Sequence, residues 1–179
     1  DATHPFATLA SGNIRAASLA VGARCLRLAR PAEVLPKGVV PVASIACAAR
    51  FLSENPGRAL LTTGSKELAP YTRVADFAER FFVRVPSAIT KCIDAGFSPS
   101  HVIGMQGPFT RELNEAMLRQ VGAQWLVTKD SGTVGGTAVK LAAARDAGAR
   151  CIVVTRPAEG GGALSLREVE DALLREFAR

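Results

Sequence analysis

The sequence predicts an α/β protein with a doubly wound, Rossmann-like parallel sheet, preceded by part of a second Rossmann-like domain. Two observations predict this fold. After Asn55-Pro56-Gly57, short apolar segments alternate with helical patterns of about ten residues, and glycines stand where those helices end. Hydrophobic residues make up 48% of the 179-residue chain and charged residues 21%, which suits a protein with an ordinary packed core.

Five apolar segments are predicted to be buried strands of a C-terminal domain that spans residues 56–179. They are Arg58–Thr62, Phe81–Val85, His101–Met105, Gln124–Thr128 and Cys151–Thr155. Helical patterns lie between them at Glu67–Asp76, Ser87–Ala95, Phe109–Val121 and Gly136–Ala147, and Ser165 with Glu168 forms a capping box for a last helix. Strand–helix–strand units of this kind are right-handed and build a parallel sheet, with Gly96, Gly122 and Gly148 at the helix ends.

Residues 1–55 are predicted to be the remainder of an N-terminal Rossmann-like domain. A helical pattern runs from Pro5 to about Val21, and Arg24–Ala29 is a short strand. Residues 31–41 contain three prolines and are predicted to be a connection, before an Ala-rich helix from Val42 to about Ser53. The residues ahead of Pro5 resemble the end of a strand, so we expect the strand itself to be missing.

Composition argues against several classes of function. The net charge of +6 is spread along the chain without a polybasic run, which disfavours a nucleic-acid partner. No apolar run approaches the ~18 residues of a membrane span, and no signal peptide opens the chain. Four scattered cysteines and two histidines give no metal-ligand spacing. We therefore expect no metal, free and mostly buried thiols, and a cytoplasmic protein.

The first candidate ligand loop follows the strand at Arg58–Thr62. Ligands of parallel α/β sheets bind at the carboxyl ends of the strands. Small residues there expose backbone N–H groups to an anion, and hydroxyls and a lysine add further donors. Thr63, Gly64, Ser65 and Lys66 are therefore candidates for binding a cofactor's phosphates. The alternative is a tight strand–helix turn with no ligand.

Arg84 is the candidate for cofactor selectivity. In dinucleotide-binding folds, the residue about 20 positions after the first loop meets the adenosine ribose. Arg84 lies 21 positions after Thr63, and an arginine there binds a 2′-phosphate, which favours NADPH while NADH stays possible. The alternative is a surface arginine at a strand end.

Two further loops carry polar groups at strand ends. Gly104, Gln106 and Gly107 let a ligand approach the backbone, so we add them to the cofactor site. Lys129-Asp130-Ser131-Gly132 combines a lysine, a carboxylate and a hydroxyl, which suits a group that orients a substrate or relays a proton. The alternative for this loop is a solvated turn with an internal Lys–Asp pair. His4, ahead of the first helix, is either an active-site residue or a capping or packing histidine.

Taken together, these motifs resemble the precorrin-6A reductase family of cobalamin biosynthesis. The matching stretches are Asp1-Ala2-Thr3-His4-Pro5-Phe6-Ala7, Leu61-Thr62-Thr63-Gly64-Ser65-Lys66, Arg84-Val85-Pro86, Gly104-Met105-Gln106-Gly107-Pro108-Phe109, Val127-Thr128-Lys129-Asp130-Ser131-Gly132 with Gly135-Gly136, and Arg156-Pro157. The likeness spans essentially the whole chain. The family normally begins with a Gly-rich strand–loop–helix ahead of the first of these motifs, and that segment is absent from this sequence.

The resemblance implies two Rossmann-like domains that face a cleft, and NAD(P)H-dependent reduction of precorrin-6A, or its cobalt form, to precorrin-6B. On this reading Thr3, His4, Pro5, Ser131 and Gly132 bind the tetrapyrrole, and Lys129, Asp130, His4 or a water supplies the proton. Two alternatives stay open: a transferase that uses a nucleotide-linked donor on the same fold, and a non-catalytic nucleotide-binding module.

The helices between Pro5 and Ser53 are predicted to lack the strands that they would normally cover. Uncovered apolar faces tend to bind a partner, either another copy of the chain or a separate N-terminal piece. We therefore predict self-association in sedimentation experiments. A compact, stable monomer without an exposed apolar patch would contradict this prediction.

Overall fold

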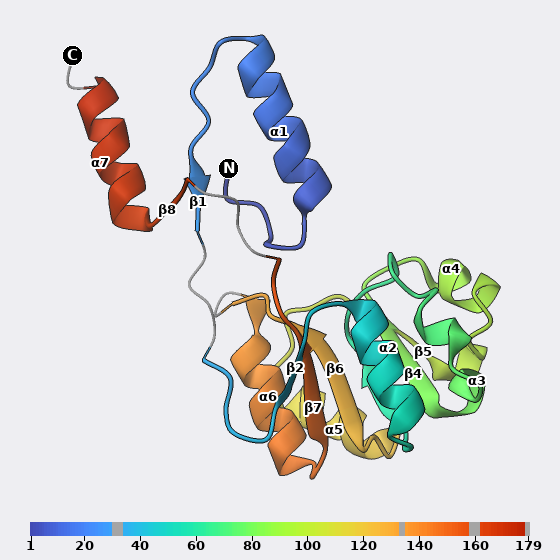
Figure 1. The fold of residues 1–179 in the computed structure, drawn as a ribbon. Coiled ribbons are helices and arrows are strands. Elements are labelled where there is room, and N and C mark those ends of the chain that lie inside the picture. Colours follow the sequence, from blue (N-terminus) through green and yellow to red (C-terminus); the bar gives the residue numbers. More distant parts are fainter. Residues whose placement is uncertain (30–33, 133–134, 158–161, 178–179) are drawn as a thin grey trace. The chain divides into compact units, whose positions relative to one another are not determined.

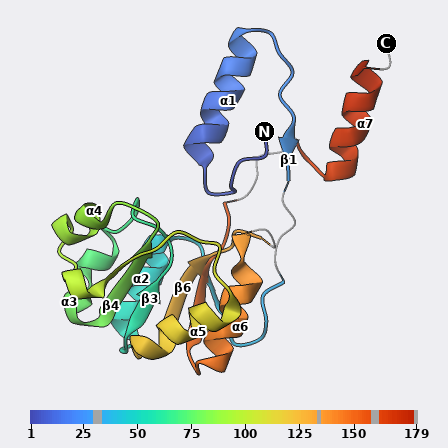
Figure 2. The same ribbon diagram turned by 180° about the vertical axis from the view of Figure 1, so that it is seen from behind.

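The computed structural model describes residues 1–29, 34–132, 135–157 and 162–177. The chain forms two compact units (Figures 1 and 2). The larger unit is Glu33–Thr155, and the smaller unit combines the two ends of the chain, Asp1–Ala32 and Arg156–Arg179. This division differs from the boundary near Asn55 that the sequence predicts.

The larger unit is built on a six-stranded sheet in which every pairing is parallel. Its strands are β2 (Val40–Val42), β3 (Ala59–Leu61), β4 (Phe81–Val85), β5 (Val102–Gly104), β6 (Trp125–Lys129) and β7 (Arg150–Val154). They lie in the order β2-β7-β6-β3-β4-β5. All five predicted strands are present, and the expected Rossmann-like fold is confirmed.

Helices cover both faces of this sheet, as a doubly wound fold requires. The helices are α2 (Ile45–Glu54), α3 (Phe77–Arg80), α4 (Ile89–Asp94), α5 (Arg111–Gln120) and α6 (Thr137–Asp146), with short 3-10 turns η1 (Tyr71–Arg73) and η2 (Pro99–His101). Figure 1 shows α2 in front of the sheet, and Figure 2, from behind, shows α5 there. On the α5/α6 face, Leu60, Phe82 and Leu126 of the strands pack with Met117 and Leu141 of the helices.

Residues 40–42 form an edge strand where the sequence predicts a connection and the start of a helix. Val40 and Val42 pair with Ile152 and Val154 of β7. Pro41 is tolerated because β2 is an edge strand. No strand lies on its outer side to need a hydrogen bond from the N–H that proline lacks. Helix α2 begins only after Ser44, whose hydroxyl accepts a hydrogen bond from the Cys47 N–H at 3.1 Å.

The helix predicted at Glu67–Asp76 does not form. Pro70 stands in the middle of that segment, where it removes a backbone donor and disfavours helical geometry in the residue before it. The chain instead makes η1, and the fully buried Tyr71 packs edge-on against Phe81 with ring centroids 6.2 Å apart. A short helix, α3, follows immediately before β4.

The segment Asn55–Gly57 is a turn inside the larger unit. Helix α2, which precedes it, buries Ile45, Ala48, Ala49 and Leu52. The Arg80 guanidinium donates to the carbonyls of Leu52, Asn55 and Gly57 at 2.9, 3.2 and 3.0 Å. These bonds fix the turn to the end of α3, which is why a strong breaker motif does not mark a boundary here.

The smaller unit contains α1 (Thr8–Ala20), β1 (Arg27–Leu28), β8 (Ala163–Leu164) and α7 (Leu166–Phe177). Strands β1 and β8 pair in parallel although they come from opposite ends of the chain. The capping box is confirmed: the Ser165 N–H donates to Glu168 Oε2 at 2.7 Å, and the Glu168 N–H donates to Ser165 Oγ at 3.3 Å. The pairing of β1 with β8 joins residues far apart in the sequence, so local sequence patterns do not predict it.

Helix α1 buries none of its residues. Leu9 and Leu19 of α1 are 78% and 82% exposed, and Phe177 of α7 is 83% exposed. The smaller unit thus carries uncovered apolar side chains, as predicted for the helix after Pro5. The predicted Val42–Ser53 helix differs in this respect, because α2 lies against the sheet of the larger unit.

Candidate functional site

The sheet order creates a point where the connections after two neighbouring strands leave in opposite directions. Strand β3 lies between β4 and β6, and Leu61 stands opposite Val127. The chain leaves β3 toward β4 and leaves β6 toward β7, so the two loops diverge at adjacent carboxyl ends. In open α/β sheets this switch point is where ligands bind. The structure therefore brings together the predicted cofactor loop at 63–66 and the predicted catalytic loop at 129–132.

The loop after β3 is fixed at its start and open at Gly64. Both the N–H and the hydroxyl of Thr62 donate to the Val127 carbonyl, at 2.8 and 2.9 Å. Thr63 is buried, with its hydroxyl 3.5 Å from the Tyr71 hydroxyl. Gly64 has a φ of +86°, and a Cβ there would meet nothing within 4 Å. Space for a ligand thus exists beside this backbone, although a turn and not a helix follows it.

The loop after β6 is tied to the loop after β3 by one ion pair. Lys129 Nζ lies 2.6 Å from Glu67 Oε2, and the two side chains are 17% and 52% exposed. This ion pair links the two loops at the switch point. Asp130 is buried, and its carboxylate accepts a hydrogen bond from the Gly132 N–H at 3.1 Å.

Thr137, at the start of α6, holds the loop after β6 in place through its side-chain hydroxyl. Its fully buried hydroxyl accepts from the Ser131 N–H at 3.1 Å, lies 3.0 Å from Ser131 Oγ and donates to the Lys129 carbonyl at 3.3 Å. Ser131 is itself 5% exposed. The loop is therefore a hydrogen-bonded structure and not a loosely solvated turn.

Arg84 points into the protein. It is 6% exposed, and its Nη1 donates to Asn114 Oδ1 at 2.8 Å and lies 3.5 Å from Met117 Sδ. The guanidinium stands 4.1 Å from the centre of the Phe109 ring. Burial lowers the pKa of Arg84 to about 10. The alternative of a surface arginine is wrong, while its predicted contact with a 2′-phosphate stays a prediction.

The remaining predicted residues belong to other elements. Gly104 is the last residue of β5 and Gln106 and Gly107 follow it, at the outer edge of the sheet, with β4 between β5 and β3. Thr3, His4 and Pro5 belong to the smaller unit. There Thr3 Oγ1 lies 2.7 Å from Ser11 Oγ and accepts from Arg27 at 2.9 Å, and His4 Nδ1 accepts from the Phe6 N–H at 3.3 Å. A local packing role explains these contacts, and their role toward a substrate stays a prediction.

Sequence reasoning missed three residues of this region: Asn114, Thr137 and Lys140. Burial, with a smaller contribution from the positive charge of Arg84, lowers the pKa of Lys140 to about 8. A signal existed, because Thr137, Lys140, Leu141 and Ala144 recur at helical spacing on one side of α6. A lysine on an otherwise inward-facing stripe is unusual.

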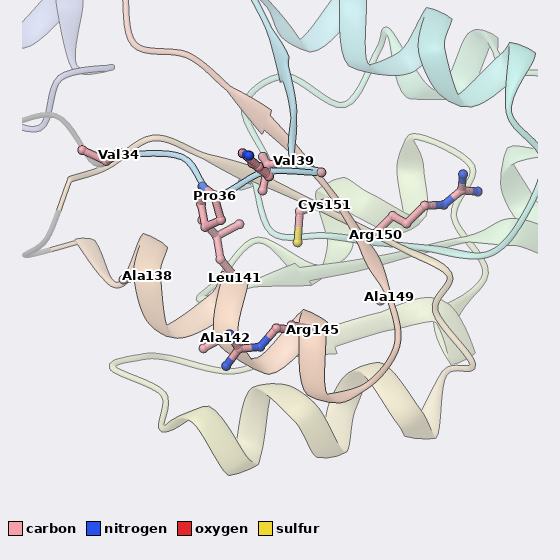
Figure 3. A pocket seen from close by; sticks show the side chains of 12 residues that line it. Val34, Pro36, Val39, Ala138, Leu141, Ala142, Arg145, Ala149, Arg150 and Cys151 are labelled. Carbon is pink, nitrogen blue, oxygen red and sulfur yellow. The ribbon is translucent and has the colours of Figure 1, made fainter.

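A second feature of the larger unit is a pocket of about 320 Å³ that lies beside α6 and the first residues of β7 (Figure 3). It is lined by Val34, Pro36, Lys37, Gly38, Val39, Ala138, Leu141, Ala142, Arg145, Ala149, Arg150 and Cys151. Arg150 extends away from the other labelled side chains and stacks 3.7 Å from the centre of the Trp125 ring. Burial raises the pKa of Cys151 to about 11, so its thiol stays protonated near neutral pH. The pocket contains none of the predicted site residues.

Among the described residues, no group of three or more His, Cys, Asp or Glu side chains comes together to hold a metal ion. No helix in the described part of the chain has the length and apolar character needed to cross a membrane.

Comparison with known proteins identifies relatives along nearly the whole chain. A family profile described as "Precorrin-6x reductase CbiJ/CobK" matches residues 1–175. The chain is 40% identical over 163 residues to a protein named cobalt-precorrin-6A reductase from Methanothermobacter thermautotrophicus, which covers 88% of this chain and 53% of that protein. It is 32% identical over 185 residues to a protein of the same name from Priestia megaterium, covering 98% and 72%.

A solved structure titled "CobK precorrin-6A reductase" is similar to this fold. The TM-score is 0.77 at 26% sequence identity, and the match covers 98% of this chain and 71% of that one. The chain thus spans between about half and three quarters of the length of these relatives.

Replacing Thr137 by valine tests whether its hydroxyl holds the loop after β6. The change keeps the side-chain shape but leaves the Ser131 N–H without its partner, so we predict a loss of about 1–3 kcal/mol in the free energy of unfolding. Urea denaturation measures it. The control is Thr72→Val, because the Thr72 hydroxyl bonds only to the nearby Ala69 carbonyl at the surface. Equal losses in both variants would contradict this role.

Proposed function

The chain belongs to the precorrin-6x reductase family, and on that premise we propose that it takes part in the NAD(P)H-dependent reduction of precorrin-6A, or its cobalt form, to precorrin-6B in cobalamin biosynthesis. The observation that carries the proposal is the pair of polar loops at the β3/β6 switch point, joined by Lys129 and Glu67. This is the position at which a parallel α/β sheet binds a dinucleotide.

The residues after β3 fit a nicotinamide dinucleotide. Free space beside Gly64 lets a diphosphate approach the backbone, and Thr63, Ser65 and Lys66 offer hydroxyls and an exposed ammonium group. The buried Arg84 on the neighbouring strand supports NADPH over NADH if its guanidinium meets a 2′-phosphate. In the family's reaction the nicotinamide supplies a hydride, which carries both electrons to the tetrapyrrole.

The protein's own part is to bind and orient the tetrapyrrole and to supply one proton, so that hydride plus proton add across the reduced double bond. Lys129 and Asp130 stand beside the cofactor loop, and Lys129 keeps part of its side chain in solvent. His4 and water are the other candidate donors. Thr137 holds Ser131 in place, so the geometry of this loop is fixed. A net charge of +6 suits a substrate that carries several carboxylates.

We also propose a cytoplasmic location, where the reductant is available. Free thiols at Cys25, Cys47, Cys92 and Cys151 are compatible with a reducing compartment, although only the last two are buried.

Anaerobic incubation of the chain with precorrin-6A and NADPH tests the activity, with nicotinamide absorbance as the readout. We expect one NADPH to be oxidised for each tetrapyrrole reduced. Binding of NADPH without any oxidation would contradict the reductase and favour a nucleotide-binding module.

Lys66→Met tests where the cofactor's diphosphate binds. NADPH and NADH share the diphosphate, so we predict that both lose affinity equally, by about tenfold or more, as expected for one charged hydrogen bond. The matched control is Lys37→Met, which removes another exposed lysine of the same unit, in the segment before β2. Isothermal titration calorimetry gives both affinities. If the Lys37 variant loses affinity and the Lys66 variant does not, the cofactor binds elsewhere.

A further inference from the structure

Two buried or half-buried cations of the larger unit have no carboxylate partner among the described residues. Arg84 contacts an amide oxygen, a thioether and an aromatic ring, all uncharged. Lys140 makes no hydrogen bond or ion pair within that part of the chain. Elsewhere the cations Arg80 and Arg119 are paired with Asp76 and Glu115. Burying a charge without a counter-ion costs free energy of folding, so the burial of these two cations suggests a role beyond packing.

Lys140 and Arg84 both face the space between the sheet and the helices α5 and α6. Lys140 shares one side of α6 with Thr137, Leu141 and Ala144, which are all buried against the sheet and α5. The Arg84 side chain extends from β4 into the space between the sheet and these helices, where it bonds to Asn114 of α5. Burial, and after it the positive charge of Arg84, lowers the pKa of Lys140.

Thr128 adds a third polar group on this side of the sheet. It is fully buried, and its hydroxyl has no hydrogen-bond partner among the described residues. Leu60, Phe82 and Leu126 stand side by side in the register and face α5 and α6. Two residues further along their strands, Arg84 and Thr128 therefore point to the same face. Both lie in the layer directly below the switch point.

We propose that Arg84, Lys140 and Thr128 form an oxyanion subsite that binds a phosphate or carboxylate group of a ligand at the switch point. An oxyanion would neutralise both cations and accept a hydrogen bond from the Thr128 hydroxyl. Asn114 occupies only Nη1 of Arg84, which leaves Nη2 and Nε to grip two oxygens of one anion. Lys140, which is half-buried, is the member that a ligand reaches from solvent.

This subsite rests on the proposed function, because the oxyanion would belong to the cofactor or to the substrate of that reaction. One source is the 2′-phosphate of NADPH, and the other is a carboxylate of the tetrapyrrole. Both share the same chemistry toward an arginine–lysine pair.

The first test uses Lys140→Met with inorganic phosphate as the probe and sodium chloride at equal ionic strength as the reference. Methionine fills similar space without a charge, so we expect the ligand-free variant to be at least as stable as the parent chain in thermal unfolding. Its phosphate affinity should fall by about tenfold or more, as for the loss of one charged hydrogen bond. The control Lys91→Met removes an exposed lysine of α4, on the other face of the sheet, and should bind phosphate like the parent. Unchanged phosphate affinity in Lys140→Met, or no binding by the parent chain, would overturn the subsite.

A second test reads the site in the unaltered chain. The side-chain NMR signal of Lys140, identified by its loss in the methionine variant, should shift when phosphate is added. A shift with 2′,5′-ADP but not with 5′-AMP assigns the site to the cofactor, whereas a shift with uroporphyrin assigns it to the tetrapyrrole. If none of these ligands moves the signal, the proposal is wrong. Because these titrations need no turnover, the subsite and the reductase activity can fail independently.

Discussion

The parallel register of β3 with β6 is the constraint on which the site depends. It sets Leu61, the last residue of β3, opposite Val127, two residues before the end of β6, so the chain leaves both strands at the same edge of the sheet. The Thr62 N–H and hydroxyl extend this pairing by donating to the Val127 carbonyl. A slip of one residue would turn the side chains of β3 to the opposite faces and remove Thr62 and Thr63 from their present positions. The Lys129–Glu67 ion pair is secondary, since an exposed pair of this kind contributes little by itself.

The candidate site continues the pattern of the core. Along three neighbouring strands the α5/α6 face carries Leu60, Phe82 and Leu126, and two residues later it carries Thr62, Arg84 and Thr128. The same alternation of side chains thus builds an apolar layer in the core and, next to it, a polar layer at the proposed ligand site. The protein does not provide partners for all polar groups of this layer. Arg84 has only uncharged partners, and the Thr128 hydroxyl has no hydrogen-bond partner among the described residues. Incomplete satisfaction of this kind is a recurring property of binding sites.

Sequence patterns predicted the parts of the fold that local chemistry determines. The apolar runs at Phe81–Val85 and Trp125–Lys129 became fully or largely buried central strands, and the Ser165–Glu168 capping box formed as expected. The parts that depend on distant residues were not predictable in this way. Strand β2 exists because Val154, over a hundred residues later, pairs with Val42, and the smaller unit exists because β8 returns to β1. Arg84 is buried because Asn114 and Phe109, on the connection between β5 and β6, pack against it, whereas its sequence neighbours indicate only that it lies at a strand end.

A dinucleotide bound at the β3/β6 switch point of the larger unit would shield the backbone of the two loops there. Hydrogen–deuterium exchange of the 179-residue chain, measured with and without saturating NADPH, detects such shielding. We predict slower exchange in the segments 62–66 and 129–132, with no change at 149–151, which lines the pocket beside α6. Protection confined to the pocket segment, with both loops unchanged, would contradict dinucleotide binding at the switch point.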